Sequence, residues 1–426
     1  MARRSVTFFA LLALGCQGVL VGSGPDARVP GVDGGAGRDA GRPPDPDAGR
    51  SADAGRASDA GRPGFDASDP GFDAGSCGAA FGAITLTPLS GVGGGPYFAA
   101  PTDTDGAVVA STGSAGARLA RYSGAGALVG AAVDVAGNGL FGFDASADTW
   151  TAMVSRGGDA LYLVGVEPSG ATRFEIRLLG EVDHDVTNNE WFGGLLRAGR
   201  VLWTGSRWAA YYTVQRLWPD GVAHYGDQLR FFDASGADDG TAWGWGCSHS
   251  MEVRIEHNGA TLAPVCASDC YPAKGIHVNH RSGMLYPDEG GSNCAGGYGT
   301  SLGDVVPVSD GFFVSFTATD ARASHDVAVV HVGNDYSIGA VQWLTTDDFR
   351  DANVRSARYG AGFVVAWSGS GAIASRASTR AARWRRGPST RRRRGLSGSS
   401  DFFVFSSGDV GWVTGGGALA RLRACP

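Results

Sequence analysis

The chain contains almost no lysine and few charged residues of either sign. Lys274 is its single lysine, so nearly all of its 36 basic side chains are arginines, and charged residues occupy only 18% of the 426 positions. The formal net charge of −6 does not favour a polyanionic partner, and nucleic acid is not expected. Past the N-terminal segment no run of 18 or more apolar residues occurs, so the sequence predicts no transmembrane helix there.

Glycine and aromatic residues are plentiful instead. The chain holds 69 glycines and 11 tryptophans, and aromatic residues make up 10% of it. Apolar runs alternate with clusters of Gly, Asp, Asn and Ser from residue 77 onward, and no segment has a convincing amphipathic helical period. This composition predicts a folded core rich in strands and turns.

The N-terminal segment has the three parts of a secretory signal. Arginines at positions 3 and 4 precede an apolar run over 6–14, which is too short to cross a bilayer as a helix. The run ends in Leu-Ala-Leu-Gly-Cys at Cys16, which resembles the lipobox of bacterial lipoproteins. The resemblance implies a signal peptide over 1–15 and a lipid on Cys16. The alternative is ordinary signal cleavage beside an incidental cysteine.

Residues 16–76 have the composition of a disordered linker. Asp-Ala-Gly occurs there five times, four times followed by Arg, and large apolar side chains are nearly absent. Such tracts resemble the spacers of surface lipoproteins in Gram-negative bacteria. Together with the lipobox, the resemblance implies an exported protein, held through Cys16 to a membrane and located at the outer membrane or cell surface.

A repeat of about 50 residues runs through the third region, 77–426. The first apolar residue after each apparent hairpin turn recurs at steps of 54, 47, 52, 52, 51 and 49 residues. This spacing matches one four-stranded blade and predicts an all-β fold, a seven-bladed β-propeller. Six or eight blades, or an array of β-sandwiches, are the alternatives. The marker residues are Ala107, Leu161, Trp208, Ala260, Phe312, Phe363 and Trp412.

The two ends of this region are predicted to close the ring. Residues 81–89 alternate as a strand does and would complete the last blade beside the strand "ALARLRA". Cys77 and Cys425 flank these two strands and are a candidate disulfide. Six cysteines follow Cys16, and an even number in an exported chain favours disulfides, although sequence does not choose among fifteen pairings. They are Cys77, Cys247, Cys266, Cys270, Cys294 and Cys425.

One repeat is rich in cysteine and histidine and holds the candidate site residues. His249, His277 and His280 are candidates for a general base, and Trp243 and Trp245 could stack on a sugar or peptide. No second pair of ligands at zinc spacing follows, so we predict no metal and no cofactor. The interpretation we favour is a disulfide-stapled loop that shapes one end of the propeller.

Residues 375–395 contain nine arginines and no acid, unlike the corresponding part of the other repeats. Three interpretations compete. The segment is a basic surface that contacts phosphates, a solvated loop, or a locally out-of-frame translation.

The sequence indicates function only in outline. We predict that a lipid-anchored propeller binds a peptide, a glycan or an envelope component without catalysis. The alternatives are a secreted hydrolase or lyase that uses the histidines of the cysteine-rich repeat, and a purely structural surface protein.

Overall fold

The computed structural model describes residues 82–424, with gaps at 103–104, 158, 194–196, 272, 279–282, 289–298, 320–323, 347, 349, 361, 370–372, 378–384, 387–395 and 397. The predicted signal peptide and linker lie outside the described residues, as does most of the arginine-rich segment. Five predicted site residues also lie outside them, namely Cys16, Cys77, His280, Cys294 and Cys425.

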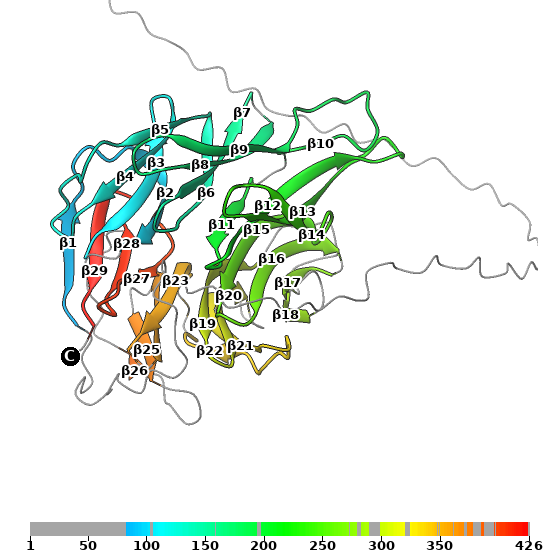
Figure 1. Ribbon diagram of the computed structural model, residues 1–426. Helices are drawn as coiled ribbons and strands as arrows, with labels where there is room; N and C mark the ends of the chain where they lie inside the picture. Colours follow the sequence, from blue (N-terminus) through cyan, green and yellow to red (C-terminus); the bar gives the residue numbers. More distant parts are fainter. Residues whose placement is uncertain are drawn as a thin grey trace, which may run out of the picture. The chain divides into compact units, whose positions relative to one another are not determined.

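The described residues form a β-propeller built of antiparallel sheets (Figure 1). The first three sheets along the chain comprise β2 (Gly94–Pro101), β3 (Ala107–Gly113), β4 (Gly116–Tyr122) and β5 (Val133–Ala136); β6 (Gly139–Ala145), β7 (Trp150–Arg156), β8 (Ala160–Val166) and β9 (Thr172–Leu179); and β10 (Glu190–Trp191), β11 (Gly199–Trp203), β12 (Arg207–Leu217), β13 (Ala223–Asp233) and β14 (Asp238–Trp243).

The next three sheets comprise β15 (Ser248–His257), β16 (Leu262–Tyr271), β17 (Gly275–Val278) and β18 (Gly283–Pro287); β19 (Ser301–Val308), β20 (Gly311–Thr319), β21 (His325–Gly333) and β22 (Gln342–Trp343); and β23 (Ala352–Tyr359), β24 (Gly362–Ser368), β25 (Ile373–Ala377) and β26 (Arg385–Arg386). The seventh contains β27 (Phe403–Val404), β28 (Val410–Val413), β29 (Ala418–Leu422) and β1 (Ile84–Pro88). No helix long and apolar enough to cross a membrane occurs among the described residues.

The predicted closure by the first strand is confirmed. Strand β1 pairs antiparallel with β29, with Ile84 opposite Leu422 and Pro88 opposite Ala418, so the blue and red ends of the chain share one sheet in Figure 1. Tyr359 of β23 supports this joint, since its hydroxyl donates to the carbonyl of Arg423 and accepts from the backbone N–H of Gly82. Both ends of the described chain are thereby fixed to one sheet.

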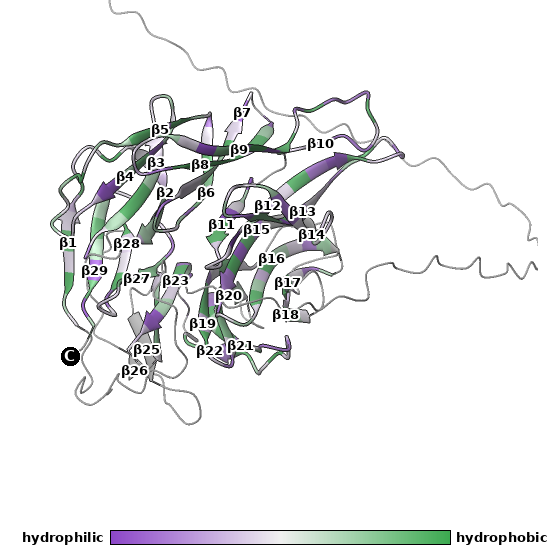
Figure 2. Cartoon of the chain, viewed as in Figure 1, coloured by the Kyte–Doolittle hydropathy of each residue, from purple (hydrophilic) through white to green (hydrophobic). Residues whose placement is uncertain are grey.

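One edge strand of each sheet contacts an edge strand of the next sheet. The contacts run from β2 to β6, β11, β15, β19, β23 and β27, and β27 contacts β2 again. These seven strands, called here the inner strands, therefore form a closed ring. Apolar side chains pack between neighbouring sheets, as where Val265 and Ile276 meet Phe312 and Phe316, and strands are largely hydrophobic in Figure 2.

One marker of the repeat is misplaced by a strand. Six of the seven markers lie on the strand that pairs with an inner strand, or in the turn before it, whereas Leu161 lies on β8, one strand farther from the inner strand β6. The true first hairpin there turns at 146–149, where the Ser146 hydroxyl accepts from the Thr149 N–H. That turn contains no glycine, so the Asp-Gly and Asn-Gly pattern does not mark it. The marker was therefore assigned to the next hairpin.

Candidate ligand site in the central cavity

Each inner strand lies at the edge of its sheet. The backbone N–H and C=O groups on its unpaired side therefore need partners other than a neighbouring strand. Side chains of the preceding inner strand supply several of them. Asp144 of β6 accepts from the N–H of Trp203 on β11, at 2.8 Å between nitrogen and oxygen. Glu252 of β15 accepts in the same way from the N–H of Leu302 on β19, at 2.7 Å. Polar side chains thus join neighbouring inner strands around the ring.

Charged side chains near the centre of the ring make the same kind of hydrogen bond to the next inner strand. Asp304 of β19 accepts from the N–H of Ser356 on β23 at 2.9 Å. Arg355 of β23 donates through Nε to the carbonyl of Ser400, which lies just before β27, at 3.2 Å. Arg254 of β15 donates to the Leu302 carbonyl at 3.3 Å. Each charged side chain is therefore held in place by backbone of the next inner strand.

Five charged residues from successive inner strands meet at the centre and are called here the charged cluster. They are Arg200, Arg254, Asp304, Arg355 and Asp401, the last lying two residues before β27. The nitrogen Nε of Arg200 lies 2.8 Å from Oδ2 of Asp401, and Nε of Arg355 lies 3.7 Å from its Oδ1. Arg200 therefore reaches from β11 to the opposite side of the ring.

The two carboxylates of the charged cluster have opposite pKa shifts. Desolvation opposes ionisation of Asp401, but Arg200, Arg254 and Arg355 together hold its pKa well below the usual range. Burial raises the pKa of Asp304 to about 6, and the negative charge of Asp401 adds to the effect. Burial also lowers the pKa of Arg200 to about 10, which still leaves the guanidinium charged at neutral pH. Asp304 is therefore the member of the cluster that titrates near neutrality.

The three arginines share one side-chain conformation. In each, Nη1 donates to the carbonyl of the preceding residue, at 2.7 Å in Arg200, 2.9 Å in Arg254 and 2.8 Å in Arg355. This bond fixes the guanidinium against its own strand and lowers the entropy lost when the group binds a partner. The repeat therefore presents three preorganised cations to the centre of the ring.

A cavity of about 220 Å³ adjoins the charged cluster and is called here the central cavity. Residues from all seven inner strands line it, and among them are Arg200, Arg254, Asp304 and Asp401. The lining extends along the strands as far as the hairpin glycines Gly205 and Gly259. Apolar walls come from Phe98, Phe143, Trp203 and Phe402, so the polar groups act in surroundings that exclude much of the water.

The charged cluster was not predicted, although the sequence contains a signal for it. Each of its members stands within or beside the apolar first strand of a repeat, as Arg does in "GRVLW" and "VRIEH" and Asp in "GDVVPV". A single charge in a strand normally indicates a solvent-facing position. Aligning the first strands of all repeats would have shown that the charges recur at one level of the ring.

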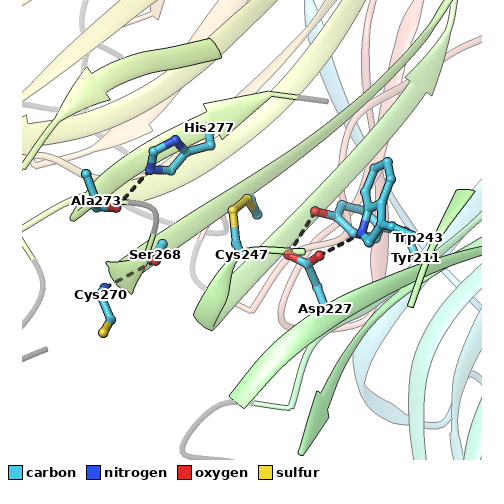
Figure 3. Close-up of a disulfide and its surroundings, with 9 residues drawn as sticks. Tyr211, Asp227, Trp243, Cys247, Ser268, Cys270, Ala273 and His277 are labelled. Atoms are coloured by element: carbon cyan, nitrogen blue, oxygen red, sulfur yellow. Dashed lines mark hydrogen bonds between the residues drawn. A yellow bond between two sulfur atoms is a disulfide. The ribbon is translucent and has the colours of Figure 1, made fainter. Parts of the chain in front are cut away.

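The cysteine-rich sheet contains a disulfide between Cys247 and Cys266, with the two Cα atoms 6.5 Å apart (Figure 3). Cys270 also takes part in a disulfide. Asp227 lies close enough to the sulfur atoms of Cys247 and Cys266 for the three to share a metal ion. Because the two cysteines are bonded to each other, they offer no thiolate to a metal in this state.

The predicted tryptophans lie in two different environments. Trp243, at the end of β14, is buried and donates its indole N–H to Oδ1 of Asp227 at 2.9 Å, beside the Tyr211 ring (Figure 3). Trp245 packs edge-on against Trp218 at 5.6 Å between ring centroids, and the Arg216 guanidinium lies 4.9 Å from the centre of its ring. Trp243 therefore belongs to the core between sheets, and Trp245 to a separate aromatic group.

Of the three predicted histidines, the structure describes the side chain of His277, which lies outside the lining of the central cavity. His277 lies on β17, the third strand of its sheet, and its Nε2 is 2.8 Å from the carbonyl of Ala273 (Figure 3). Burial lowers the pKa of His277. The backbone of His249 belongs to β15, but its side chain and the whole of His280 lie outside the described part. The convergence of these histidines, which the rival hydrolase or lyase interpretation requires, stays a prediction.

Comparison with known proteins shows likeness in fold. No protein-family model and no curated protein matches the chain. A streptogramin B lyase is 12% identical and aligns over 80% of this chain and 97% of its own, with a TM-score of 0.44. The β-propeller domain of Cps50 from Myceliophteria thermophila is 9% identical over 80% of this chain and all of its own, with a TM-score of 0.43.

A third similar structure is an oligogalacturonate lyase in complex with manganese. It is 10% identical and aligns over 81% of this chain and 98% of its own, with a TM-score of 0.44. Because lyases and a propeller domain of another kind resemble the chain at equally low identity, the likeness extends to the fold and no further.

Proposed function

We propose that each of the seven sheets is one blade and that the propeller binds a small ligand in the central cavity without converting it chemically. The observation that carries the proposal is the convergence of the charged cluster on one cavity lined by every inner strand. A concave, largely apolar cavity with a few convergent polar groups is the usual form of a ligand site. The closed ring of inner strands supports the count of seven, because β27 contacts β2.

A cavity-filling variant tests this proposal. Val404 lines the cavity on β27, whereas Val222 is 51% exposed outside it, so Val404→Trp and Val222→Trp add the same bulk at different places. We expect native mass spectrometry of the gently purified protein to show a bound molecule, whose occupancy falls about tenfold in Val404→Trp and is unchanged in Val222→Trp.

Two outcomes would contradict the proposal. The first is equal occupancy in the two variants, which would place the ligand elsewhere on the propeller. The second is a change in the mass of the released molecule after incubation with fresh protein, which would indicate catalysis.

We further propose that the propeller is exported and held to a membrane at the outer membrane or cell surface by a lipid on Cys16, with residues 16–76 as a flexible spacer. The lipobox resemblance of the segment ending at Cys16 supports this, together with the solvated Asp-Ala-Gly tract that follows it. One acyl chain binds membranes only weakly, so stable anchoring requires a second acyl chain or another contact with the membrane.

The anchor is tested by the substitution Cys16→Ser. We expect the unchanged protein to incorporate labelled palmitate and to sediment with membranes, and Cys16→Ser to lose both properties. Cys247→Ser provides the control, because Cys247 is engaged in a disulfide within the propeller. Retention of the label in Cys16→Ser would place the lipid elsewhere and overturn the proposal.

A further inference from the structure

We propose that the ligand of the central cavity carries an oxyanion group, namely a carboxylate, sulfate or phosphate, that Arg200 and Arg254 bind and whose affinity Asp304 controls through its protonation. The inference rests on the proposed binding function and adds the chemical class of the ligand. It follows from the donors, the charges and the size of the cavity.

The charged cluster has an excess of hydrogen-bond donors. A guanidinium carries five N–H groups, whereas a carboxylate accepts about four bonds, so three arginines around Asp401 supply more donors than it can accept. The Nε–H group of Arg200 is buried and, although near Asp401, is aligned with no acceptor among the described residues. A buried donor without an acceptor costs free energy, which an incoming oxyanion would recover.

Positive charge is concentrated at the charged cluster. The charged cluster holds three cations and two carboxylates, and Asp304 has a pKa of about 6, so the cluster is positive throughout the physiological range. Farther along the cavity, Arg358 and Glu256 contribute one charge of each sign. Asp144, which also lines the cavity, adds a negative charge that accepts from the backbone N–H groups of Trp203 and Ala145. An anion therefore finds its most favourable position beside Arg200 and Arg254.

The size and surroundings of the central cavity suit a small anionic group. A volume of about 220 Å³ is smaller than the range of roughly 300–1,000 Å³ that drug-sized ligands occupy, so the bound group is a small molecule or the end of a larger one. The Arg200 guanidinium lies 5.5 Å from the centre of the Phe98 ring, which shields it from water on that side. Charge-assisted hydrogen bonds are stronger in such surroundings.

Asp304 links this site to pH. Its Oδ2 accepts from the backbone N–H of Ser356, whereas its Oδ1 is buried without a hydrogen-bond partner among the described residues. The charged groups that face it are Arg200 of β11, Arg254 of β15, Arg355 of β23 and Asp401 before β27, and Ser315 of β20 bonds to its backbone. As the pH falls through about 6, Asp304 takes up a proton and one negative charge leaves the cluster. Anion affinity therefore rises as the pH falls.

Sulfate is the probe for the main experiment, because its charge is constant over the range used. We expect titration calorimetry to show sulfate binding at about pH 5 that is roughly tenfold tighter than at about pH 8. Arg200→Gln and Arg254→Gln should each weaken the binding at about pH 5 by tenfold or more. Arg207→Gln is the control, because Arg207 is 42% exposed and pairs with Asp239 away from the cavity. Succinate and inorganic phosphate, titrated at one pH, then distinguish the three oxyanions.

Asp304→Asn separates the pH control from the binding itself. Asparagine keeps an oxygen for the Ser356 N–H, so we expect tight sulfate binding at both pH values. Asp134→Asn provides the matched control, because Asp134 is 53% exposed on β5, and it should retain the full pH dependence. Thermal unfolding of each variant shows whether it is folded.

The possible failures are distinct from those of the proposed function. If none of the three oxyanions binds, or if Arg207→Gln weakens binding as much as Arg200→Gln, the oxyanion assignment is wrong. Loss of a retained molecule in Val404→Trp would still support ligand binding in that case. If Asp304→Asn keeps the pH dependence of the unchanged protein, the role given to Asp304 is wrong.

Discussion

Replacing Arg421 with methionine will lower the free energy of unfolding by about 3–5 kcal/mol. Arg421 lies on β29 with only 8% of its side chain exposed, and it forms ion pairs with Asp409 of its own sheet and Asp105 of the sheet that begins with β2. It also donates to the Ser407 hydroxyl and stacks on the Phe405 ring, 4.4 Å from the ring centre. The substitution leaves the buried Asp409 carboxylate without its main partner at the joint where the ring closes.

Arg423 provides a matched control for this prediction. Its guanidinium lies 3.5 Å from the same Asp409 carboxylate, but its side chain is 56% exposed. An exposed ion pair contributes little, so Arg423→Met should cost no more than about 1 kcal/mol. Chemical denaturation followed by tryptophan fluorescence measures both values. Equal losses in the two variants would show that burial at Arg421 does not decide its contribution.

Asp227→Ala will destabilise the cysteine-rich side of the propeller by about 2–6 kcal/mol. Asp227 is fully buried on β13, where it accepts from the Tyr211 hydroxyl at 3.1 Å and from the Trp243 indole N–H at 2.9 Å (Figure 3). Alanine removes the acceptor and leaves two buried donors unpaired, each at a cost of about 1–3 kcal/mol. Denaturant titration with the disulfide intact gives the change in free energy.

Asparagine at the same position distinguishes lost hydrogen bonds from lost charge. Its side-chain oxygen can still accept from Trp243, and the Tyr211 oxygen can accept from its amide, so the expected loss for Asp227→Asn is about 1 kcal/mol. If Asp227→Asn is as unstable as Asp227→Ala, the negative charge itself stabilises the fold, and the hydrogen-bond explanation is insufficient.

The sequence predicts the propeller because its main signal is local. A hairpin turn needs residues that tolerate positive φ, and Asp-Gly or Asn-Gly supplies them at regular spacing along the chain. Where another turn chemistry serves the same purpose, as at Ser146 and Thr149, the spacing shifts by one strand. The closing strand was also predictable. Its apolar residues alternate with polar ones, and it precedes the first repeat, so the last sheet was the expected partner.

The central cavity was not predicted because its residues are far apart in sequence. Arg200 and Asp401 meet across the ring, and nothing near either residue indicates the other. The disulfide was open for a similar reason, since spacing alone does not pair Cys247 with Cys266. Cysteine and histidine are concentrated in one repeat, so their pattern is visible in the sequence. The charged cluster takes one residue from each of five sheets, so no single repeat indicates it.

The pairing of β1 with β29 imposes an order on folding. Ile84 is synthesised long before its partner Leu422, which follows it at a great distance along the chain. Until then β1 has no strand to pair with, and Leu86, which is 52% exposed even in the finished fold, belongs to an open edge. Contacts between such distant residues form slowly. A chain truncated before β29 would therefore keep an unpaired, partly apolar first strand that invites association with other copies.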